Sequence, residues 1–218
     1  MDIIEALHFN GSERKYEDVY DDDVYAIGVD CAGGVGGDYS CISVVSLASK
    51  EIAYQYRSNT VLPVEFAEQV LKVAQLYNDA TVLVETNNHG HLVLHKLDEW
   101  GYKNLWKSVK NKDWVTSAKS KIEMYEVLRE IISNNMITRM DMSTLMELRS
   151  MTIFKVAPEA PPGMHDDLAD SLALAYRCSV DIPSYVVQNA KRSWMDNMLS
   201  SKRANRIRMM RLPYKRAE

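Results

Sequence analysis

Four acidic residues stand at places in the sequence where packing alone would favour apolar side chains. Asp30 ends one short apolar run, Glu85 ends another, and Asp166 and Asp167 stand where an alanine-rich helix is expected to begin. A buried carboxylate is costly unless a cation balances its charge. If both runs are strands that end at the same edge of a sheet, a divalent metal ion is the expected partner of these acids.

An all-carboxylate ligand set predicts Mg²⁺ or Mn²⁺, because both ions prefer hard oxygen ligands. Zinc is disfavoured because His89, His91 and His95 include one pair four residues apart but lack a third ligand at a suitable spacing. Two hard ions about 3.5–4 Å apart can split a phosphodiester, since one activates a water molecule and the other stabilises the leaving oxygen. We therefore expect two Mg²⁺ or Mn²⁺ ions and phosphodiester hydrolysis.

An alternative explanation of these acids needs no metal. In it, Asp30 binds loop amides, Glu85 caps the helix that follows it, and Asp166 is the N-cap of the last helix. This alternative suits any one of the acids, but it accounts less well for all of them in this order along the chain.

The elements that must position the acids follow a mixed α/β order. Residues 24–30, 39–47 and 51–57 are predicted strands in succession, which favours antiparallel pairing. Strands and helices then alternate, as they do in sheets with parallel strands. The remaining predicted elements are a helix from Pro63, a strand at 81–85, a helix at 92–100, a strand at 104–106 and helices at 117–134 and 166–178. The predicted fold class is α/β, with a central mixed sheet flanked by helices.

Length and charge indicate one domain with appendages. The chain has 218 residues, of which 46% are hydrophobic, and this suffices for one buried core. We expect a polar N-terminal segment at 1–23, the domain at 24–180 and a basic tail at 181–218. The tail holds nine Lys and Arg against three acidic residues, which leaves a net charge of −10 for the rest. Such a tail suits contact with nucleic acid or an acidic partner, and equally a solvated chain end.

Several classes of protein are disfavoured. No apolar run approaches the roughly 18 residues of a membrane span, and the N-terminus lacks a signal peptide, so a soluble cytoplasmic protein without membrane contact is expected. Cys31, Cys41 and Cys178 are too few and too scattered for a disulfide framework. The glycine run at 33–37 lacks the Gly-Lys-Ser/Thr ending of a phosphate-binding loop, which argues against an ATP site of that type.

Four short motifs occur in a fixed order: Gly28-Val29-Asp30 with Gly36-Gly37-Asp38-Tyr39-Ser40, then Val84-Glu85-Thr86-Asn87-Asn88-His89-Gly90, then Thr116-Ser117 with Lys119 and Lys121, and last His165-Asp166-Asp167-Leu168-Ala169-Asp170-Ser171. Over about residues 24–179 the chain thereby resembles the nuclease domain of the large terminase subunit of tailed bacteriophages and herpesviruses, which has an RNase H-like fold. Each motif alone is weak, but the ordered set is specific.

The resemblance implies a sheet in which Asp30 and Glu85 lie on neighbouring strands while the last helix brings its acids against them. Asp167 and Asp170 are three residues apart and share a helix face, which favours Asp167 as the ligand from the helix. Asp166 stays open as the alternative, because a frayed first turn would present it instead. By the same resemblance Asp170 ranks as a weaker metal ligand.

Further residues acquire roles from the resemblance. Asp38 follows the glycine loop and is a second weak candidate ligand, acting through water. Lys119 and Lys121 precede a helix and would offset charge on bound phosphates or on the carboxylates, although exposed lysines at a helix start are the simpler alternative. Asn87 and Asn88 are expected to form a tight turn that allows a DNA backbone to approach.

The function implied by the resemblance is a metal-dependent endonuclease that cuts concatemeric double-stranded viral DNA during packaging. Its implied partners are DNA, a packaging ATPase, the small terminase subunit and the portal, in the cytoplasm of an infected bacterium. Two alternatives remain open. One is a resolvase of four-way DNA junctions, and the other is a non-catalytic DNA-binding or docking module.

Overall fold

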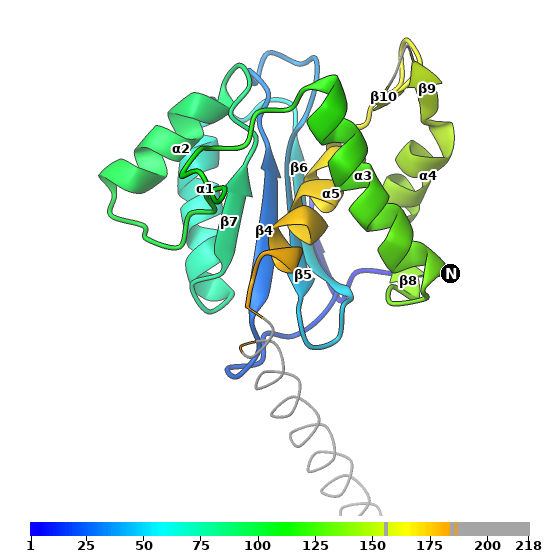
Figure 1. Ribbon diagram of the computed structural model, residues 1–218, viewed down its shortest axis with the longest axis horizontal. Helices are drawn as coiled ribbons and strands as arrows, with labels where there is room; N and C mark the ends of the chain where they lie inside the picture. Colours follow the sequence, from blue (N-terminus) through cyan, green and yellow to red (C-terminus); the bar gives the residue numbers. More distant parts are fainter. Residues whose placement is uncertain (155–156, 184–185, 187–218) are drawn as a thin grey trace, which may run out of the picture.

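The computed structural model describes residues 1–154, 157–183 and 186. Within these residues one mixed sheet dominates the architecture (Figure 1). In spatial order its strands are β2 (His8–Asn10), β3 (Glu13–Lys15), β6 (Ile52–Ser58), β5 (Ser40–Ser46), β4 (Tyr25–Asp30) and β7 (Thr81–Val84). β4 runs parallel to β7, and every other pair is antiparallel. The predicted antiparallel run followed by a parallel strand is therefore present.

Helices cover both faces of the sheet (Figure 1). Two of them pack on one face, namely α1 (Pro63–Leu76) and α2 (Gly90–Glu99). On the other face, α5 (Asp167–Val180) lies against β4 and β5, and it is flanked by α3 (Ala118–Ser133) and α4 (Met142–Ser150). The result is a three-layer α/β arrangement with a core on each side of the sheet.

The side chains of β4 alternate between these two cores. Tyr25, Ile27 and Val29 pack with α1 and α2, whereas Ala26 packs on the face that carries α3 and α5. A strand of period two that is buried on both faces reads as a continuous apolar run, and this is the pattern seen in the sequence. β4 is therefore an inner strand, and its last residue, Asp30, comes out at the end of the sheet.

Gly28 allows α5 to lie unusually close to β4. A Cβ atom at this position would be 2.0 Å from the carbonyl oxygen of Ser171 and 2.3 Å from the amide nitrogen of Ala175. Both are backbone atoms, so no larger residue fits unless the helix moves. Gly28 thus sets the distance between Asp30 and the acids in the first turn of α5.

The polar N-terminal segment predicted at 1–23 contributes short strands to the fold. Residues of this segment form β2 and β3, which extend the sheet beyond β6, and β1 (Asp2–Ile3), which pairs in parallel with β8 (Arg139–Met140). Short edge strands are joined by backbone hydrogen bonds and carry polar side chains, so hydrophobic periodicity does not reveal them. Tyr16, just after β3, is buried in the core beside α3 and α5.

Other differences concern short elements. The strand predicted at 104–106 is reduced to a single bridge between Leu105 and Val82. Two strands that the sequence did not predict, β9 (Thr152–Phe154) and β10 (Ala157–Glu159), pair antiparallel just before α5. Residues 181–183 and 186 are described, but the rest of the predicted basic tail lies outside the described residues. Among the helices described, none is long and apolar enough to cross a membrane.

Candidate metal centre

A cavity of about 710 Å³ opens where β4 and β7 end. The loop after β4, which contains the predicted glycine run, forms one wall, and the start of α5 forms another. Six acids line this cavity, and all of them are predicted site residues: Asp30, Asp38, Glu85, Asp166, Asp167 and Asp170. The fold therefore brings together side chains from two parallel strand ends, a loop and a helix start.

Asp30 has no side-chain hydrogen bond within the described residues, although it is largely buried. Burial raises the pKa of its carboxyl well above the ordinary value, and the nearby carboxylates of Glu85, Asp170, Asp167 and Asp166 raise it further, in that order. A negative charge at this position is thus poorly compensated by the protein. An added cation would supply the compensation that is missing.

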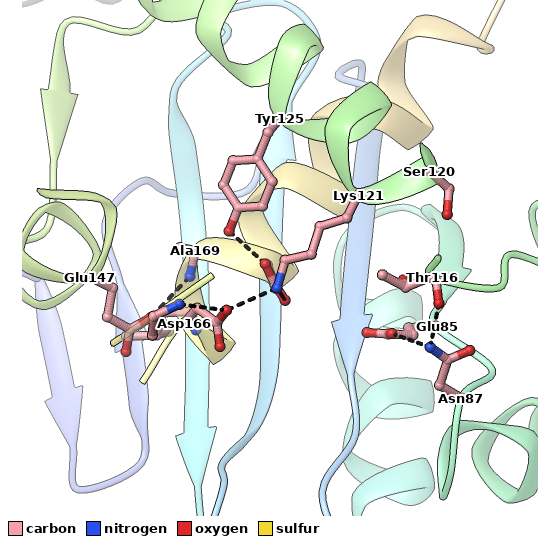
Figure 2. Close-up of polar contacts among 12 residues, drawn as sticks. Glu85, Asn87, Thr116, Ser120, Lys121, Tyr125, Glu147, Asp166 and Ala169 are labelled. Atoms are coloured by element: carbon pink, nitrogen blue, oxygen red, sulfur yellow. Dashed lines mark hydrogen bonds and ion pairs between the residues drawn. The ribbon is translucent and has the colours of Figure 1, made fainter. Parts of the chain in front are cut away.

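Glu85 follows β7 and is held by its neighbours in the chain. Its amide donates to the carbonyl oxygen of Val29, at 3.0 Å. The Asn87 side-chain amide donates to Glu85 Oε1 at 3.0 Å and to the carbonyl oxygen of Thr116 at 2.8 Å (Figure 2). Gly90 permits the tight turn that follows, since a Cβ there would lie 1.7 Å from the Glu85 carbonyl oxygen. Asn87 therefore orients a carboxylate of the site and ties it to the segment before α3.

Asp167 is the first residue of α5 and keeps one oxygen free. The Tyr39 amide donates to Asp167 Oδ1 at 3.2 Å. Asp167 Oδ2 is buried without a hydrogen bond from the described residues, and His165 Nδ1 lies 3.3 Å from it. Burial raises the pKa of this carboxyl, while the Tyr39 amide and His165 act in the opposite direction. A buried carboxylate oxygen without a donor is a natural position for a cation.

Lys121 of α3 binds both Asp166 and Asp170, and Figure 2 shows its contact with Asp166. Lys121 Nζ lies 2.8 Å from Asp166 Oδ2 and 2.8 Å from Asp170 Oδ2, and the Tyr125 hydroxyl donates to Asp170 Oδ1 at 2.5 Å. Burial raises the pKa of Asp170 to about 7, although Lys121 opposes this shift. Burial alone would lower the pKa of Lys121, but the two carboxylates more than offset it and raise the pKa. Both oxygens of Asp170 are thus occupied.

The donor chemistry fits a hard divalent cation. The free oxygens belong to carboxylates, and Asp30 and Asp167 are the acids whose charge is least compensated. No three His, Cys, Asp or Glu side chains within the described residues stand close enough to hold a metal ion as they are. Asn87 restrains Glu85, and Lys121 restrains Asp166. Asp30, Glu85 and Asp167 are the residues that could hold the ion.

Of the other predicted residues, some line the cavity and some do not. Asn88 lines the cavity and has a positive φ of 49°, as the expected tight turn requires. His89 lines it too and stands against Gly33. Lys119 is exposed at the start of α3 and is not among the described residues that line the cavity. The two predicted lysines therefore differ, because Lys121 is buried among the acids and Lys119 is not.

Sequence reasoning missed the residues that support the acids. Tyr125 lies within the helix predicted at 117–134, but its contact with Asp170 was not predicted. Glu147, on a helix that was not predicted, and Arg57 carried no local signal. Tyr39 stood in a quoted motif, but no role was assigned to it. Each acts through a partner that is distant in the sequence, so spacing along the chain could not reveal it.

Residues 27–177 match the model of a protein family described as the Terminase RNaseH-like domain. The chain belongs to this family. The match spans the sheet from β4 to β7, the glycine loop, and α5 with its acids. The predicted RNase H-like fold and the resemblance to terminase nuclease domains are thereby confirmed.

Similar nucleases of known structure include two from Thermus phages. The chain is 28% identical to the large terminase subunit of Thermus phage G20c over 183 residues, which cover 81% of this chain but 36% of that protein. The G20c large terminase nuclease with bound magnesium is similar with a TM-score of 0.70 and 26% identity, over 81% of this chain and 92% of the other. Further structures of that nuclease hold cobalt or zinc. The large terminase nuclease domain of Thermus phage P74-26 gives a TM-score of 0.67 and 25% identity, over 80% and 90%.

Proposed function

We propose that the chain is a divalent-metal-dependent endodeoxyribonuclease, the nuclease part of a large terminase subunit. The observation that carries this proposal is the cavity that Asp30, Glu85 and Asp167 line in common. Two of these three acids, Asp30 and Asp167, carry carboxylate charge that the described protein does not neutralise. The magnesium-bound structure of a similar nuclease supports the same reading.

In this proposal Asp30, Glu85 and Asp167 hold the metal. Mg²⁺ or Mn²⁺, as two ions, would supply an activated water molecule and charge stabilisation at the phosphate. The chain itself orients the ligands: Asn87 holds Glu85, and the Tyr39 amide holds Asp167. Lys121 keeps Asp166 and Asp170 ion-paired, so these two acids serve as supports of the centre.

The proposed substrate is concatemeric double-stranded viral DNA, cut during genome packaging in the cytoplasm of an infected bacterium. The glycine loop at 33–37 supports access by a bulky polymer, because Gly37 presents no side chain at the mouth of the cavity. The proposed partners are a packaging ATPase, the small terminase subunit and the portal. These partners are proposed from the resemblance to large terminase subunits, and this chain spans 36% of the length of one such relative.

The test is cleavage of supercoiled plasmid by the purified chain with Mg²⁺, with Mn²⁺ and with EDTA. We expect nicked and linear products with either metal and none with EDTA. Asp30→Ala should lower the rate by more than about a hundredfold, because it removes a ligand of the centre. Asp98→Ala, which changes an exposed acid of α2, is the matched control and should cleave at the normal rate.

Two results would overturn the proposal. Cleavage that persists in EDTA would remove the metal from the mechanism, and full activity of a folded Asp30→Ala variant would remove the acidic centre. A further assay lets a four-way DNA junction compete with linear duplex for cleavage by the chain. Strong preference for the junction over linear duplex would assign the same centre to a resolvase.

A further inference from the structure

The first turn of α5 needs hydrogen-bond acceptors that its own N-cap residue does not supply. The first amides of a helix have no partner within the helix, and an Asp at the N-cap usually accepts from them. Asp166 occupies the N-cap position, but its side chain makes no capping bond in the described structure. Its Oδ2 instead binds Lys121 and accepts from the Ala160 amide at 3.3 Å.

Glu147 of α4 accepts from these amides in its place. Glu147 Oε2 accepts from the Leu168 amide at 2.8 Å and from the Ala169 amide at 3.1 Å (Figure 2). These are the second and third residues of α5, the positions that an N-cap side chain would serve. Glu147 is 7% exposed, so water does not compete strongly for the two donors. A carboxylate from another helix thus caps α5 and faces the positive end of its dipole.

The other oxygen of Glu147 is connected to Asp167 through a second set of contacts. Glu147 Oε1 lies 2.9 Å from Arg57 Nη2. The Arg57 guanidinium stacks on the ring of Tyr39, with Cζ 3.8 Å from the ring centroid. The Tyr39 amide in turn donates to Asp167 Oδ1. Glu147 therefore supports Asp167 through the helix backbone on one side and through Arg57 and Tyr39 on the other.

We propose that Glu147 is a positioning residue of the metal centre, which caps α5 from outside and so leaves its first-turn acids free to face the cavity. If Asp166 capped its own helix, its carboxylate would turn toward the backbone amides and away from Lys121. With Glu147 as the cap, Asp166, Asp167 and Asp170 all line the cavity. This inference rests on the proposed function, because the centre that it serves is the proposed one.

Three substitutions separate the cap from the charge. Glu147→Ala removes the acceptor and the partner of Arg57. Glu147→Gln keeps one oxygen acceptor at nearly the same place, whereas Glu147→Asp keeps the charge on a side chain one methylene shorter. Glu130→Gln, at an exposed position of α3, repeats the Glu to Gln change where no contact with the site exists.

The experiment measures Mn²⁺ affinity by calorimetry, hydrogen exchange of the peptide that contains residues 166–170, and plasmid cleavage, all on the full chain. For Glu147→Ala we expect Mn²⁺ affinity to fall about 10–100-fold, the range typical for residues that orient metal ligands. Exchange at the amides of 168 and 169 should accelerate. Glu147→Gln should recover most of the affinity, and Glu130→Gln should match the wild type.

The outcomes distinguish this inference from the proposed function. A folded Glu147→Ala variant with normal Mn²⁺ affinity and normal exchange at 168 and 169 would overturn the positioning role and leave the nuclease proposal intact. If Glu147→Ala does not fold, Glu147→Asp decides the question, because its shorter side chain should cap the Leu168 and Ala169 amides less well and bind Mn²⁺ more weakly than Glu147→Gln. Equal Mn²⁺ affinities of Glu147→Asp and the wild type would then overturn the positioning role. A wild-type chain that binds Mn²⁺ but cleaves nothing would count against the nuclease, while the order of the affinities would still decide the role of Glu147.

Discussion

At the scale of single residues, the centre is a balance between crowded carboxylates and one internal cation. Lys121 neutralises the acids nearest to it, Asp166 and Asp170. Asp30 and Asp167 receive no comparable partner within the described residues. This division separates Asp166 and Asp170, whose charge Lys121 balances, from Asp30 and Asp167, which we propose as metal ligands.

Replacement of Asp30 should stabilise the metal-free chain, whereas most substitutions lower the stability of a folded protein. The folded-state pKa of Asp30 is raised above its unfolded value, so ionisation costs more in the folded chain and stability falls as pH rises past the unfolded pKa. In EDTA, Asp30→Asn should therefore gain thermal stability over the wild type as pH rises from about 4 to about 8. Thermal unfolding across this pH range measures the difference between the two proteins.

Added Mg²⁺ provides the control for this prediction. The ion should stabilise the wild type by mass action and stabilise Asp30→Asn much less, because the variant lacks a charged ligand. A difference in stability that does not change with pH in EDTA would contradict the raised pKa of Asp30.

Lys121 and Lys119 form a natural pair for mutation, because they have the same side chain and stand two residues apart on α3. Lys121→Ala should destabilise the metal-free chain by roughly 3–5 kcal/mol, since it leaves two carboxylates without their buried cation. Lys119→Ala, at an exposed position, should stay within about 0.5 kcal/mol of the wild type. Urea unfolding in EDTA measures both values, and equal losses would refute the structural distinction between them.

At the scale of elements, the contact between β4 and α5 decides whether the acids meet. Gly28→Ala should destabilise the chain by at least about 3 kcal/mol, because the new methyl group meets the backbone of α5 and no side chain can yield. Gly37→Ala is the matched control, since nothing lies within 4 Å of the added atom and its φ is not positive. Thermal unfolding compares the two variants. A tolerated Gly28→Ala would contradict the close packing of α5.

The sequence predicted β4 and β7 because local hydrophobic patterns determine both strands. The apolar runs that end at Asp30 and Glu85 determine β4 and β7, and parallel neighbours place both ends at one edge of the sheet. The structure shows these acids lining one cavity with Asp167. Their roles as metal ligands remain a prediction.

Other parts of the site could not be inferred from local pattern. α4 was not predicted, and with it Glu147 was missed, because its importance lies in contacts with Leu168 and Ala169 that only the tertiary fold creates. The sequence also gives no basis for distinguishing Lys119 from Lys121, since both were predicted to have the same role. Burial separates them, and burial depends on how α3 packs against α5.

At the scale of the whole molecule, the distribution of charge opposes binding to DNA unless the tail or metal ions compensate. The tail at 181–218 contains nine basic residues, and the rest of the chain has a net charge of −10. Removal of residues 187–218 should leave the fold and metal-dependent cleavage in place, because every acid that lines the cavity precedes the cut.

The truncated chain should bind DNA more weakly, with a smaller dependence of affinity on salt, because fewer phosphate charges are neutralised. Fluorescence anisotropy at several salt concentrations measures the slope, and a plasmid assay at saturating DNA measures cleavage. Loss of cleavage at saturating DNA would favour the alternative of a docking module that acts through its tail.

The packing of α5 on β4 also has a consequence for the order of folding during synthesis. The hydrogen bond between Tyr39 and Asp167 joins residues 128 positions apart, so the cavity is incomplete until α5 has left the ribosome and docked. Contacts of such long range form late and slowly. A nascent chain would therefore carry β4 and β7 with no working centre. The proposed nuclease activity would begin only when α5 has docked, which protects nucleic acids from a partly synthesised enzyme.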